Sequence, residues 1–289
     1  MIYKAHKMFF KVLTFSLLIT GCSEKNASVP VKKEMHGKLF IIGGGEKTPL
    51  LMSEMLRQAG ISPGDYIAVL PMSSEEPDTA FLYFSNAIRK VSQVNCVNLA
   101  FTEVNINNTR KLDSLAQAKL IFITGGDQER FMKLVKNSPV ALAIHNAYQN
   151  GALVGGTSAG AAVMSKVMIT GDQNFSPEYS GTYDKLWKEN AIYAEGLGLV
   201  ERVVVDQHFV ARSRYNRLLS ALCDYPGMMG IGIDEETAVI VSGDSASVCG
   251  DGQVIIFHPV DTCNVYDRHL GMKNVRIDIL LSGDQFRLP

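Results

Sequence analysis

The sequence predicts an α/β fold: a doubly wound, mostly parallel sheet followed by C-terminal antiparallel hairpins. Three observations predict it: short apolar runs recur through the first half, helical patterns separate them, and short β-like runs with glycine turns follow residue 230. Alternating strands and helices are typical of a parallel sheet with helices on both faces. The composition agrees, because 46% of the 289 residues are hydrophobic and 20% are charged, as in ordinary globular proteins.

The N-terminus has the pattern of a bacterial lipoprotein signal peptide. Three lysines precede an apolar run over residues 12–19, and Ile19-Thr20-Gly21-Cys22 resembles a lipobox. The apolar run is too short to span a bilayer as a helix, which takes about 20 residues. We therefore expect residues 1–21 to be a signal peptide that is removed and Cys22 to carry lipid, with either Met1 or Met8 as the start.

Residues 22–36 are polar and aperiodic, which predicts a tether, and the length and composition of residues 37–289 predict a single globular domain. Removal of residues 1–21 takes three of the 28 basic residues and none of the 29 acidic ones, leaving a formal charge of -4. This charge argues against a nucleic-acid partner, which requires a basic face. We expect the lipid to be the sole membrane contact, on a Gram-negative outer membrane facing the periplasm or the cell surface. A homodimer is compatible with the sequence.

Four apolar runs in the first half end in glycine or polar clusters, which predicts buried parallel strands. Helical patterns fill the intervals between them. In a doubly wound sheet, ligand sites lie beyond the carboxyl ends of the strands, where these glycine-rich turns fall. The predicted strands are residues 39–42, 67–70, 120–124 and 152–154, and the predicted helices are residues 49–59, 79–91, 128–136 and 139–150.

After Gly230, the pattern predicts antiparallel hairpins, because short β-like runs are separated by Ser-Gly-Asp and Gly-Asp-Gly turns. Together with residues 275–281, these runs are expected to extend or cover one edge of the main sheet. Cys249 and Cys263 flank a predicted hairpin, and their spacing allows either a disulfide or two buried thiols. The predicted strands are residues 231–233, 238–241, 247–249 and 254–257.

Ser158 lies in a sharp turn between a predicted strand and a predicted helix over residues 159–168. Residues 156–160 have the G-x-S-x-G pattern of a nucleophile elbow, in which small neighbours allow a strained backbone that exposes the hydroxyl. The helix N-terminus would then stabilise negative charge on an attacked carbonyl oxygen. The alternative is a glycine-rich turn in which the serine caps a helix.

A serine nucleophile requires a histidine base and an acid that orients it. Of six histidines, His208 directly follows an apolar strand and should emerge on the ligand side of the sheet, although a structural role is the alternative. Asp234 and Glu235 follow another strand in the same way. Because adjacent side chains of a strand point to opposite faces, only one of the two can face the site, and the pattern leaves open which one.

Three arginines follow His208 at the entry to a predicted helix: Arg212, Arg214 and Arg217. Their guanidinium groups could clamp a carboxylate. Charge runs of this kind, considered without other information, favour a solvated basic face.

Four segments together resemble the cyanophycinase family of serine peptidases, peptidase family S51, which is related to the aspartyl dipeptidases. Their order and approximate spacing match, and the likeness extends from about residue 37 to residue 257. It implies a fold similar to that of the class I glutamine amidotransferases. The segments are residues 122–128, 155–161, 206–209 with the following arginines, and 230–238.

The resemblance implies that Ser158 is the nucleophile, His208 the general base and Glu235 the acid that orients the histidine. The N–H groups of Ala159 and Gly126 are our predicted oxyanion donors. This chemistry requires neither a metal nor an organic cofactor. The residues implied to line the substrate site are Gln128, Asp206, Gln207, Arg212, Arg214 and Arg217.

Members of the family hydrolyse cyanophycin, a polyaspartate with arginine on each side chain, to β-Asp-Arg dipeptides. The order serine, histidine, acid argues against an ordinary α/β-hydrolase, whose acid precedes its histidine. Residues 171–194 depart from the family pattern, which keeps peptidases for other aspartyl or isoaspartyl peptides as an alternative. A non-catalytic periplasmic binding protein with the same fold is a second alternative.

Overall fold

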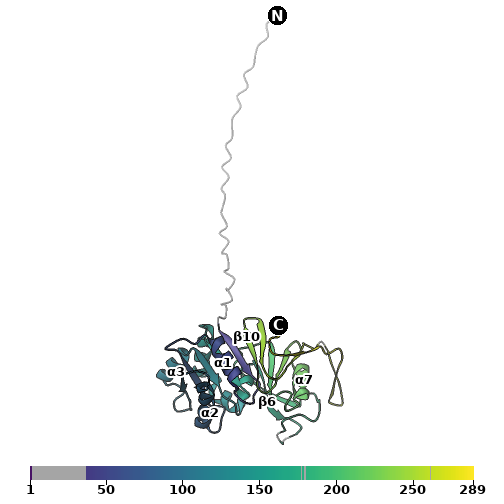
Figure 1. Cartoon of the computed structure of the whole chain (residues 1–289). Coiled ribbons are helices and arrows are strands. Elements are labelled where there is room, and N and C mark those ends of the chain that lie inside the picture. The colour runs from purple at the N-terminus through teal and green to yellow at the C-terminus, as the bar shows by residue number, and fades with distance from the viewer. Residues whose placement is uncertain (2–36, 177, 179, 261) are drawn as a thin grey trace. The chain divides into compact units, whose positions relative to one another are not determined.

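The structure is a computed structural model that describes Met1 and residues 37–289, except residues 177, 179 and 261 (Figure 1). Apart from Met1, the predicted signal peptide and tether, including Cys22, lie outside the described residues. Within the described part of the chain, no helix combines the length and apolar character needed to cross a membrane.

The main sheet has eight strands in the order β16-β11-β10-β1-β5-β4-β2-β3. Its parallel part consists of β1 (Lys38–Ile42), β2 (Tyr66–Leu70), β3 (Asn95–Asn98), β4 (Leu120–Ile123) and β5 (Leu153–Thr157). Three antiparallel strands continue it beyond β1: β10 (Thr237–Ser242), β11 (Ser245–Gly250) and β16 (Gln285–Arg287). The prediction of a mostly parallel sheet with C-terminal antiparallel hairpins is confirmed. Strand β1 joins the two parts because it pairs with β5 on one side and β10 on the other.

Helices cover both faces of the main sheet, as a doubly wound fold requires. Phe40 and Ile42 of β1 pack with α1 (Pro49–Ala59) and α2 (Pro77–Arg89), whereas Leu39 and Ile41 belong to the core formed with the helices of the other face. This alternation is the two-residue period of a strand that is buried on both sides. The other face carries α3 (Thr109–Ala116), α4 (Gln128–Val135) and α5 (Pro139–Gln149).

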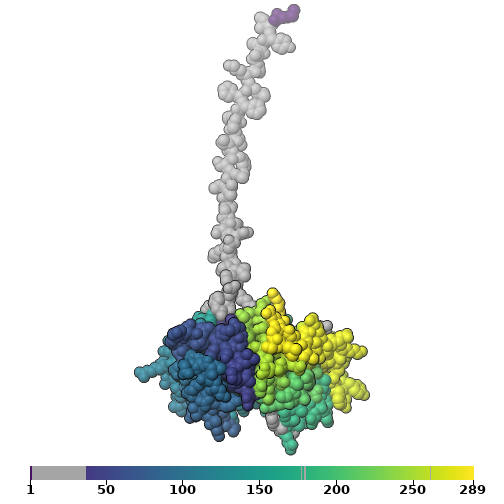
Figure 2. Space-filling view, viewed as in Figure 1, coloured from purple at the N-terminus to yellow at the C-terminus, as the bar shows by residue number. Residues whose placement is uncertain are grey.

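A second sheet of four strands lies beside the first, in the order β15-β12-β9-β8. It contains β8 (Val203–Gln207), β9 (Met229–Ile233), β12 (Val254–Phe257) and β15 (Ile277–Leu280), and α7 (Tyr215–Asp224) packs on one of its faces. The expectation that the C-terminal runs extend the main sheet is confirmed for β10 and β11. It is wrong for residues 231–233, 254–257 and 275–281, because β9, β12 and β15 pair with one another in the second sheet, which shares a hydrophobic core with β10 and β11. Figure 2 shows the earlier and later parts of the described chain as neighbouring halves.

The helix after Ser158 is much shorter than the predicted helix over residues 159–168. Helix α6 covers only Ala159–Ala162, and β6 (Val167–Gln173) then pairs with β7 (Ala191–Glu195). The helix ends because its next carbonyl groups are taken by another segment. The N–H groups of residues 197 and 199 donate to the carbonyl oxygens of residues 163 and 164, at 2.6 and 2.9 Å.

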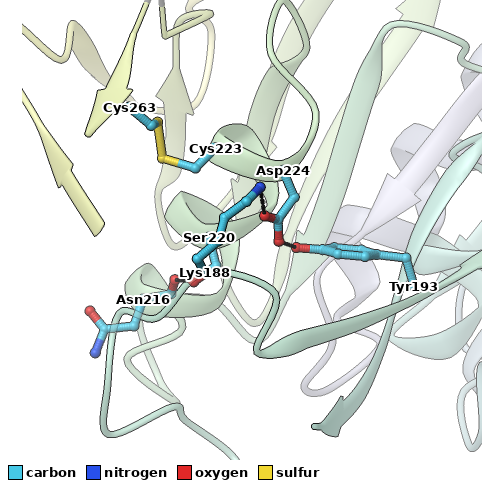
Figure 3. Close-up of a disulfide and its surroundings, with 7 residues drawn as sticks. All are labelled: Lys188, Tyr193, Asn216, Ser220, Cys223, Asp224 and Cys263. Atoms are coloured by element: carbon cyan, nitrogen blue, oxygen red, sulfur yellow. Dashed lines mark hydrogen bonds and ion pairs between the residues drawn. A yellow bond between two sulfur atoms is a disulfide. The ribbon is translucent and has the colours of Figure 1, made fainter. Parts of the chain in front are cut away.

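A disulfide joins Cys223, in α7, to Cys263, the first residue of the hairpin β13 (Cys263–Tyr266) and β14 (His269–Met272) (Figure 3). The predicted alternative of a Cys249–Cys263 disulfide is wrong, because Cys249 lies in β11 of the main sheet and its thiol is free. Burial raises the pKa of that thiol to about 12. The other alternative, a free thiol, thus applies to Cys249, which is half-buried, and not to Cys263.

The β13–β14 hairpin and residues 180–190 form a small unit that we call the hairpin lobe. Backbone hydrogen bonds join its two segments, from Lys188 N–H to the Arg268 carbonyl oxygen and from Leu270 N–H to the Leu186 carbonyl oxygen. Next to the disulfide, the Asp224 carboxylate accepts hydrogen bonds from Lys188 Nζ and from the hydroxyl of a tyrosine in β7, at 2.6 and 2.8 Å (Figure 3). These contacts attach the lobe to the C-terminal end of α7.

Candidate active site

Ser158 follows β5 and adopts a left-handed backbone conformation, with φ 53° and ψ -112°. Such a conformation is strained for a residue with a side chain, and strain of this kind is typical of functional turns. The flanking glycines make it sterically feasible. A Cβ on Gly156 would collide with the carbonyl oxygen of Gly160, and a Cβ on Gly160 would collide with the carbonyl oxygen of Ile123. The serine therefore occupies a tight turn that tolerates no larger residue at either glycine.

His208 follows β8 and lies between Ser158 and Glu235. Its Nε2 is 2.8 Å from Ser158 Oγ, and its Nδ1 is 2.5 Å from Glu235 Oε1. A carboxylate can only accept, so Nδ1 carries the proton and Nε2 is free to accept the hydrogen bond of the serine hydroxyl. Three residues from the ends of different strands thus form one continuous hydrogen-bonded chain.

The neighbouring carboxylate, Asp234, points away from the histidine. Its Oδ1 accepts hydrogen bonds from the backbone N–H groups of Val210 and Ala211, at 3.1 and 2.9 Å. Of the two acids that the sequence pattern left open, Glu235 is therefore the one that contacts His208. Asp234 holds the turn that follows the histidine.

Burial is the largest influence on His208, whose side chain is close to fully enclosed. It lowers the pKa of the imidazole below its ordinary value, and nearby Arg212 and Arg214 lower it further. The hydrogen bond to Glu235 opposes this effect. The net direction favours a neutral imidazole, which is the form that can accept a proton from a serine hydroxyl.

The end of β1 and the glycine turn after it, residues 42–45, hold the backbone at or next to Ser158, His208 and Glu235. The sequence did not predict this role. The carbonyl oxygens of residues 42–44 accept hydrogen bonds from the backbone N–H groups of Ser158, His208 and Glu236, at 3.1, 2.8 and 3.0 Å. A Cβ on Gly44 would collide with the His208 ring. The sequence shows a glycine triplet at the end of an apolar run. Its supporting role could be predicted only if β1 were known to lie between β5 and β10.

The arginines after His208 do not form a solvated basic face. Arg214 and Arg217 are 2% and 1% exposed. Arg217 forms a bidentate ion pair with Asp206, in which Nε donates to Oδ2 at 2.7 Å. Arg214 Nη1 donates to the Gln207 carbonyl oxygen at 2.8 Å and also contacts the Gln207 side chain. Only Arg212 is exposed.

Five of the six residues predicted to line a substrate site border one cavity of about 290 Å³, together with Ser158. Asp206 lies behind it, where it orients Arg217. The Gln128 side chain is fixed by hydrogen bonds from Nε2 to the carbonyl oxygens of Ile169 and Thr170, at 3.0 and 2.6 Å. We call this space the arginine cavity; the five residues are Gln128, Gln207, Arg212, Arg214 and Arg217.

The predicted oxyanion donors flank the nucleophile. Ala159 opens α6, and the first N–H groups of a helix have no partner within the helix. Gly126 borders the arginine cavity, and its φ of 135° and the collision that a Cβ would make with the Ser73 carbonyl oxygen both require glycine. The N–H of Gly126 donates to no other backbone group of the described chain. Both groups are therefore available to a ligand.

The other described histidines make their contacts elsewhere. His145 is half-buried, and its Nε2 lies 2.8 Å from the Leu197 carbonyl oxygen. His258 Nε2 lies 2.6 Å from Asp278 Oδ2 in the second sheet. In the part of the chain that the structure describes, no group of three or more histidine, cysteine or acidic side chains is arranged to hold a metal ion.

Comparisons with known proteins identify relatives over most of the chain. The family model described as peptidase family S51 matches residues 39–249. A cyanophycinase from Trichormus variabilis is 33% identical over 266 residues, which cover 86% of this chain and 85% of the relative. A cyanophycinase from Geminocystis herdmanii is 32% identical over 274 residues, which cover 89% and 95%.

Solved structures show the same fold. The crystal structure of a peptidase from an acI-B1 Actinobacterium superposes with a TM-score of 0.65 at 24% identity, over 89% of this chain and 98% of the other. A putative peptidase E from Listeria monocytogenes superposes with a TM-score of 0.50 at 14% identity, over 75% and 99%.

Proposed function

This chain belongs to peptidase family S51 and is a serine-type peptidase, and we propose that it hydrolyses cyanophycin to β-Asp-Arg dipeptides through Ser158, His208 and Glu235. One observation carries the proposal. The serine hydroxyl, the imidazole and the carboxylate are joined by hydrogen bonds, and the serine opens into a cavity lined by arginines. The names of the relatives at 31–33% identity support the polymer as substrate.

The first step is attack of Ser158 Oγ on a backbone aspartyl carbonyl. The proton of the hydroxyl passes to Nε2 of His208, and Glu235 stabilises the imidazolium that forms. The N–H groups of Gly126 and Ala159 donate to the oxyanion of the tetrahedral intermediate. The imidazolium then returns the proton to the leaving amine, and the acyl-enzyme is left on the serine.

The second step is hydrolysis of the acyl-enzyme. His208, now neutral, accepts a proton from a water molecule, whose oxygen attacks the ester carbonyl. The imidazolium returns that proton to Ser158 Oγ as the acyl bond breaks, so that the enzyme is restored and a carboxylic acid is released. The lowered pKa of His208 supports this role, because the imidazole must be neutral at the start of each step.

The arginine cavity suits the acyl part of the polymer. Each cyanophycin unit carries a free carboxylate on its arginine, and guanidinium groups bind carboxylates through charge-assisted hydrogen bonds. Arg212 is the exposed member of the group and is suited to direct contact. Arg217 is committed to Asp206 and would act by shaping the wall of the cavity.

Product analysis tests the proposal. The full-length protein, incubated with purified cyanophycin, is expected to release β-Asp-Arg dipeptides that mass spectrometry detects. Ser158→Ala should reduce the rate by a factor of about 10⁶, as removal of a catalytic serine does in other serine peptidases. Intact polymer after incubation with the wild-type protein, or dipeptide release at the same rate by Ser158→Ala, would falsify the proposal.

A second candidate substrate class is supported by the wall of the arginine cavity. Gly171 and Asp172 line the cavity, and they belong to the segment over residues 171–194 that departs from the family pattern. A change at this position would alter the acyl side of the substrate and leave the three reacting groups in place. Hydrolysis of short aspartyl or isoaspartyl peptides, with cyanophycin left intact, would favour this candidate.

We also propose that the protein is exported and anchored by lipid on Cys22. The lysines, the short apolar run and the lipobox-like segment before Cys22 support this proposal, and Ser23 favours the outer membrane. Metabolic labelling with a fatty-acid analogue is expected to label the wild-type protein and not Cys22→Ser. An unlabelled wild-type protein in a bacterium that lipidates its own lipoproteins would exclude the anchor.

A further inference from the structure

A second cavity borders Ser158 on the side of α2. Its volume is about 580 Å³, compared with about 290 Å³ for the arginine cavity. Ser158 borders both spaces, whereas His208 borders the larger one and not the arginine cavity. Ser158 therefore lies between two cavities, and of these His208 borders only the larger one.

The position of His208 assigns the two sides, if the chain works as proposed above. The imidazolium must protonate the leaving amine, so the leaving nitrogen has to lie within hydrogen-bond reach of Nε2. That places the leaving residue in the larger cavity. The acyl residue then lies in the arginine cavity, which Gly126, one of the two predicted oxyanion donors, also borders.

Two buried hydroxyl groups line the larger cavity without a partner. Thr124 and Thr157 are each 4% exposed, and neither hydroxyl oxygen has a hydrogen-bond partner in the described part of the chain. Buried polar groups in folded proteins are normally paired. Both hydroxyl oxygens are closed to solvent, so the backbone of a leaving residue would pair with them only after the threonine side chains turn towards the cavity.

Aromatic rings form an apolar wall of the same cavity. Phe84 and Phe122 are stacked, with ring centroids 3.8 Å apart, and both are buried. Tyr83 lines the same cavity and is 55% exposed, and Lys47 Nζ lies over its ring, 5.7 Å from the centroid, so a ligand cation on this ring would share it with the lysine. An aliphatic stem fits against such a wall, and a guanidinium can lie on an exposed ring.

Two acids stand at the opening, at the N-terminal end of α2. Glu75 already forms an ion pair with Arg130, at 2.6 Å. Glu76 occupies the N-cap position, yet its side chain makes no capping hydrogen bond. Glu76 lines the cavity and is exposed, and it is the member of the pair suited to receive a ligand.

Lys47 is the cation that lines this cavity, and two further acids offset it. Its Nζ donates to the Gly45 carbonyl oxygen at 2.7 Å, and Glu235 and Glu236 stabilise its charge. Burial nevertheless lowers the pKa of Lys47 to about 8. The lining of this cavity thus contains one lysine and two glutamates, of which Glu75 is already paired with Arg130.

We propose that the larger cavity is the leaving-group subsite and that it selects a leaving residue whose side chain ends in a guanidinium. The guanidinium lies on the Tyr83 ring and pairs with the Glu76 carboxylate, while Thr124 and Thr157 bind the backbone of the same residue. The inference rests on the proposed function, because the direction of the substrate follows from proton donation by His208.

A matched pair of synthetic substrates tests the subsite. Both are dimers of β-Asp-Arg, and in one of them citrulline replaces the arginine of the leaving unit. Citrulline has the same shape but no charge, and the acyl unit is unchanged. We expect kcat/KM of the wild-type protein to be about tenfold higher for the arginine dimer, from one exposed cation–π contact and one exposed ion pair.

Two variants assign that preference to this cavity. Glu76→Gln and Tyr83→Leu should each lower kcat/KM about threefold to tenfold more for the arginine dimer than for the citrulline dimer. The rate that remains on the citrulline dimer reports that the variants fold and react. Glu201→Gln removes an exposed carboxylate that borders neither cavity and serves as the matched control, with the full preference retained.

The outcomes separate the subsite from the proposed function. Equal kcat/KM for the two dimers, with Ser158→Ala inactive on both, would overturn the subsite and leave the peptidase proposal standing. A full preference for arginine in both Glu76→Gln and Tyr83→Leu would also overturn it. Cleavage of the dimers by Ser158→Ala at the wild-type rate would overturn the proposed function, and the subsite with it.

Discussion

The candidate active site around Ser158, His208 and Glu235, which we call the corner, and the hairpin lobe are held in place by different kinds of interaction. In the corner, the backbone itself is fixed: three N–H groups bond to the carbonyl oxygens of residues 42–44, and glycines fill the places where a Cβ would collide. In the lobe, side chains make the attachment, through the Cys223–Cys263 disulfide and the Lys188–Asp224 ion pair. Main-chain hydrogen bonds thus fix the backbone that carries the reacting atoms, whereas side-chain contacts attach the lobe.

The largest expected effect contrasts two adjacent residues of the corner. Glu235→Gln should lower kcat by about 10⁴-fold, because an amide no longer holds the His208 tautomer and no longer stabilises the imidazolium. Asp234→Asn keeps an oxygen that accepts from the same two N–H groups, so we expect activity within about threefold of wild type. Steady-state kinetics on cyanophycin decides, and equal losses in the two variants would contradict the assignment of the acid.

The next effect belongs to the lobe and concerns stability. The disulfide closes a loop with a sequence separation of 40, so the double variant Cys223→Ser, Cys263→Ser should lose about 4 kcal/mol of unfolding free energy. Activity below the unfolding transition should stay within about threefold of wild type. Urea denaturation and kinetics on the same samples measure both, with Cys96→Ser as the control for a thiol that forms no disulfide.

Gly44→Ala tests whether the corner depends on backbone packing. The new methyl group has to displace the His208 ring, and a displacement of about 1 Å typically costs about 10²-fold in rate. Gly60→Ala is the matched control, since Gly60 also has a positive φ but its Cβ would meet open space. That variant should lose about 1 kcal/mol of stability without loss of activity. Similar activity in the two variants would show that the corner tolerates repacking.

The smallest effect is a pH dependence. Because burial lowers the pKa of His208 below its ordinary 6.5, kcat/KM should be constant above that value and fall about tenfold per unit below the lowered pKa. Between the two values the unfolded chain binds a proton that the folded chain does not, so stability also falls as the pH drops through this window. An acid limb centred above 6.5 in the pH profile would contradict a lowered pKa of His208.

The sequence was informative where a signal is local. Buried parallel strands are apolar throughout, and their helices begin at recognisable caps such as Thr48 and Ser138. The half-buried edge strand β3, residues Asn95–Asn98, has no such run and was not predicted. The same holds for the candidate site. The glycines around Ser158 predicted the sharp turn from the local sequence, whereas the choice of Glu235 over Asp234 came from the family resemblance.

Features that depend on distant partners could not be predicted. The burial of Arg214 and Arg217 depends on Asp206 and Gln207, whose positions follow from the pairing of β8 with β9. The disulfide partner of Cys263 depends on where α7 ends relative to the second sheet. Helix α6 stops because residues 196–200 bond to the carbonyl groups of residues 163–166, which follow it. In each case a tertiary contact decides between alternatives that the local sequence leaves equal.

The glycine turn after β1 has a consequence for when activity can arise during synthesis. Residues 42–44 come early in the chain, but the groups that bond to them come from three later segments, the last of which follows β9. Loop closure over such separations is slow compared with local helix formation. A growing chain can therefore complete its parallel strands and still be inert. If the proposed mechanism holds, we expect hydrolytic activity only after the C-terminal third has been made and has returned to the first strand.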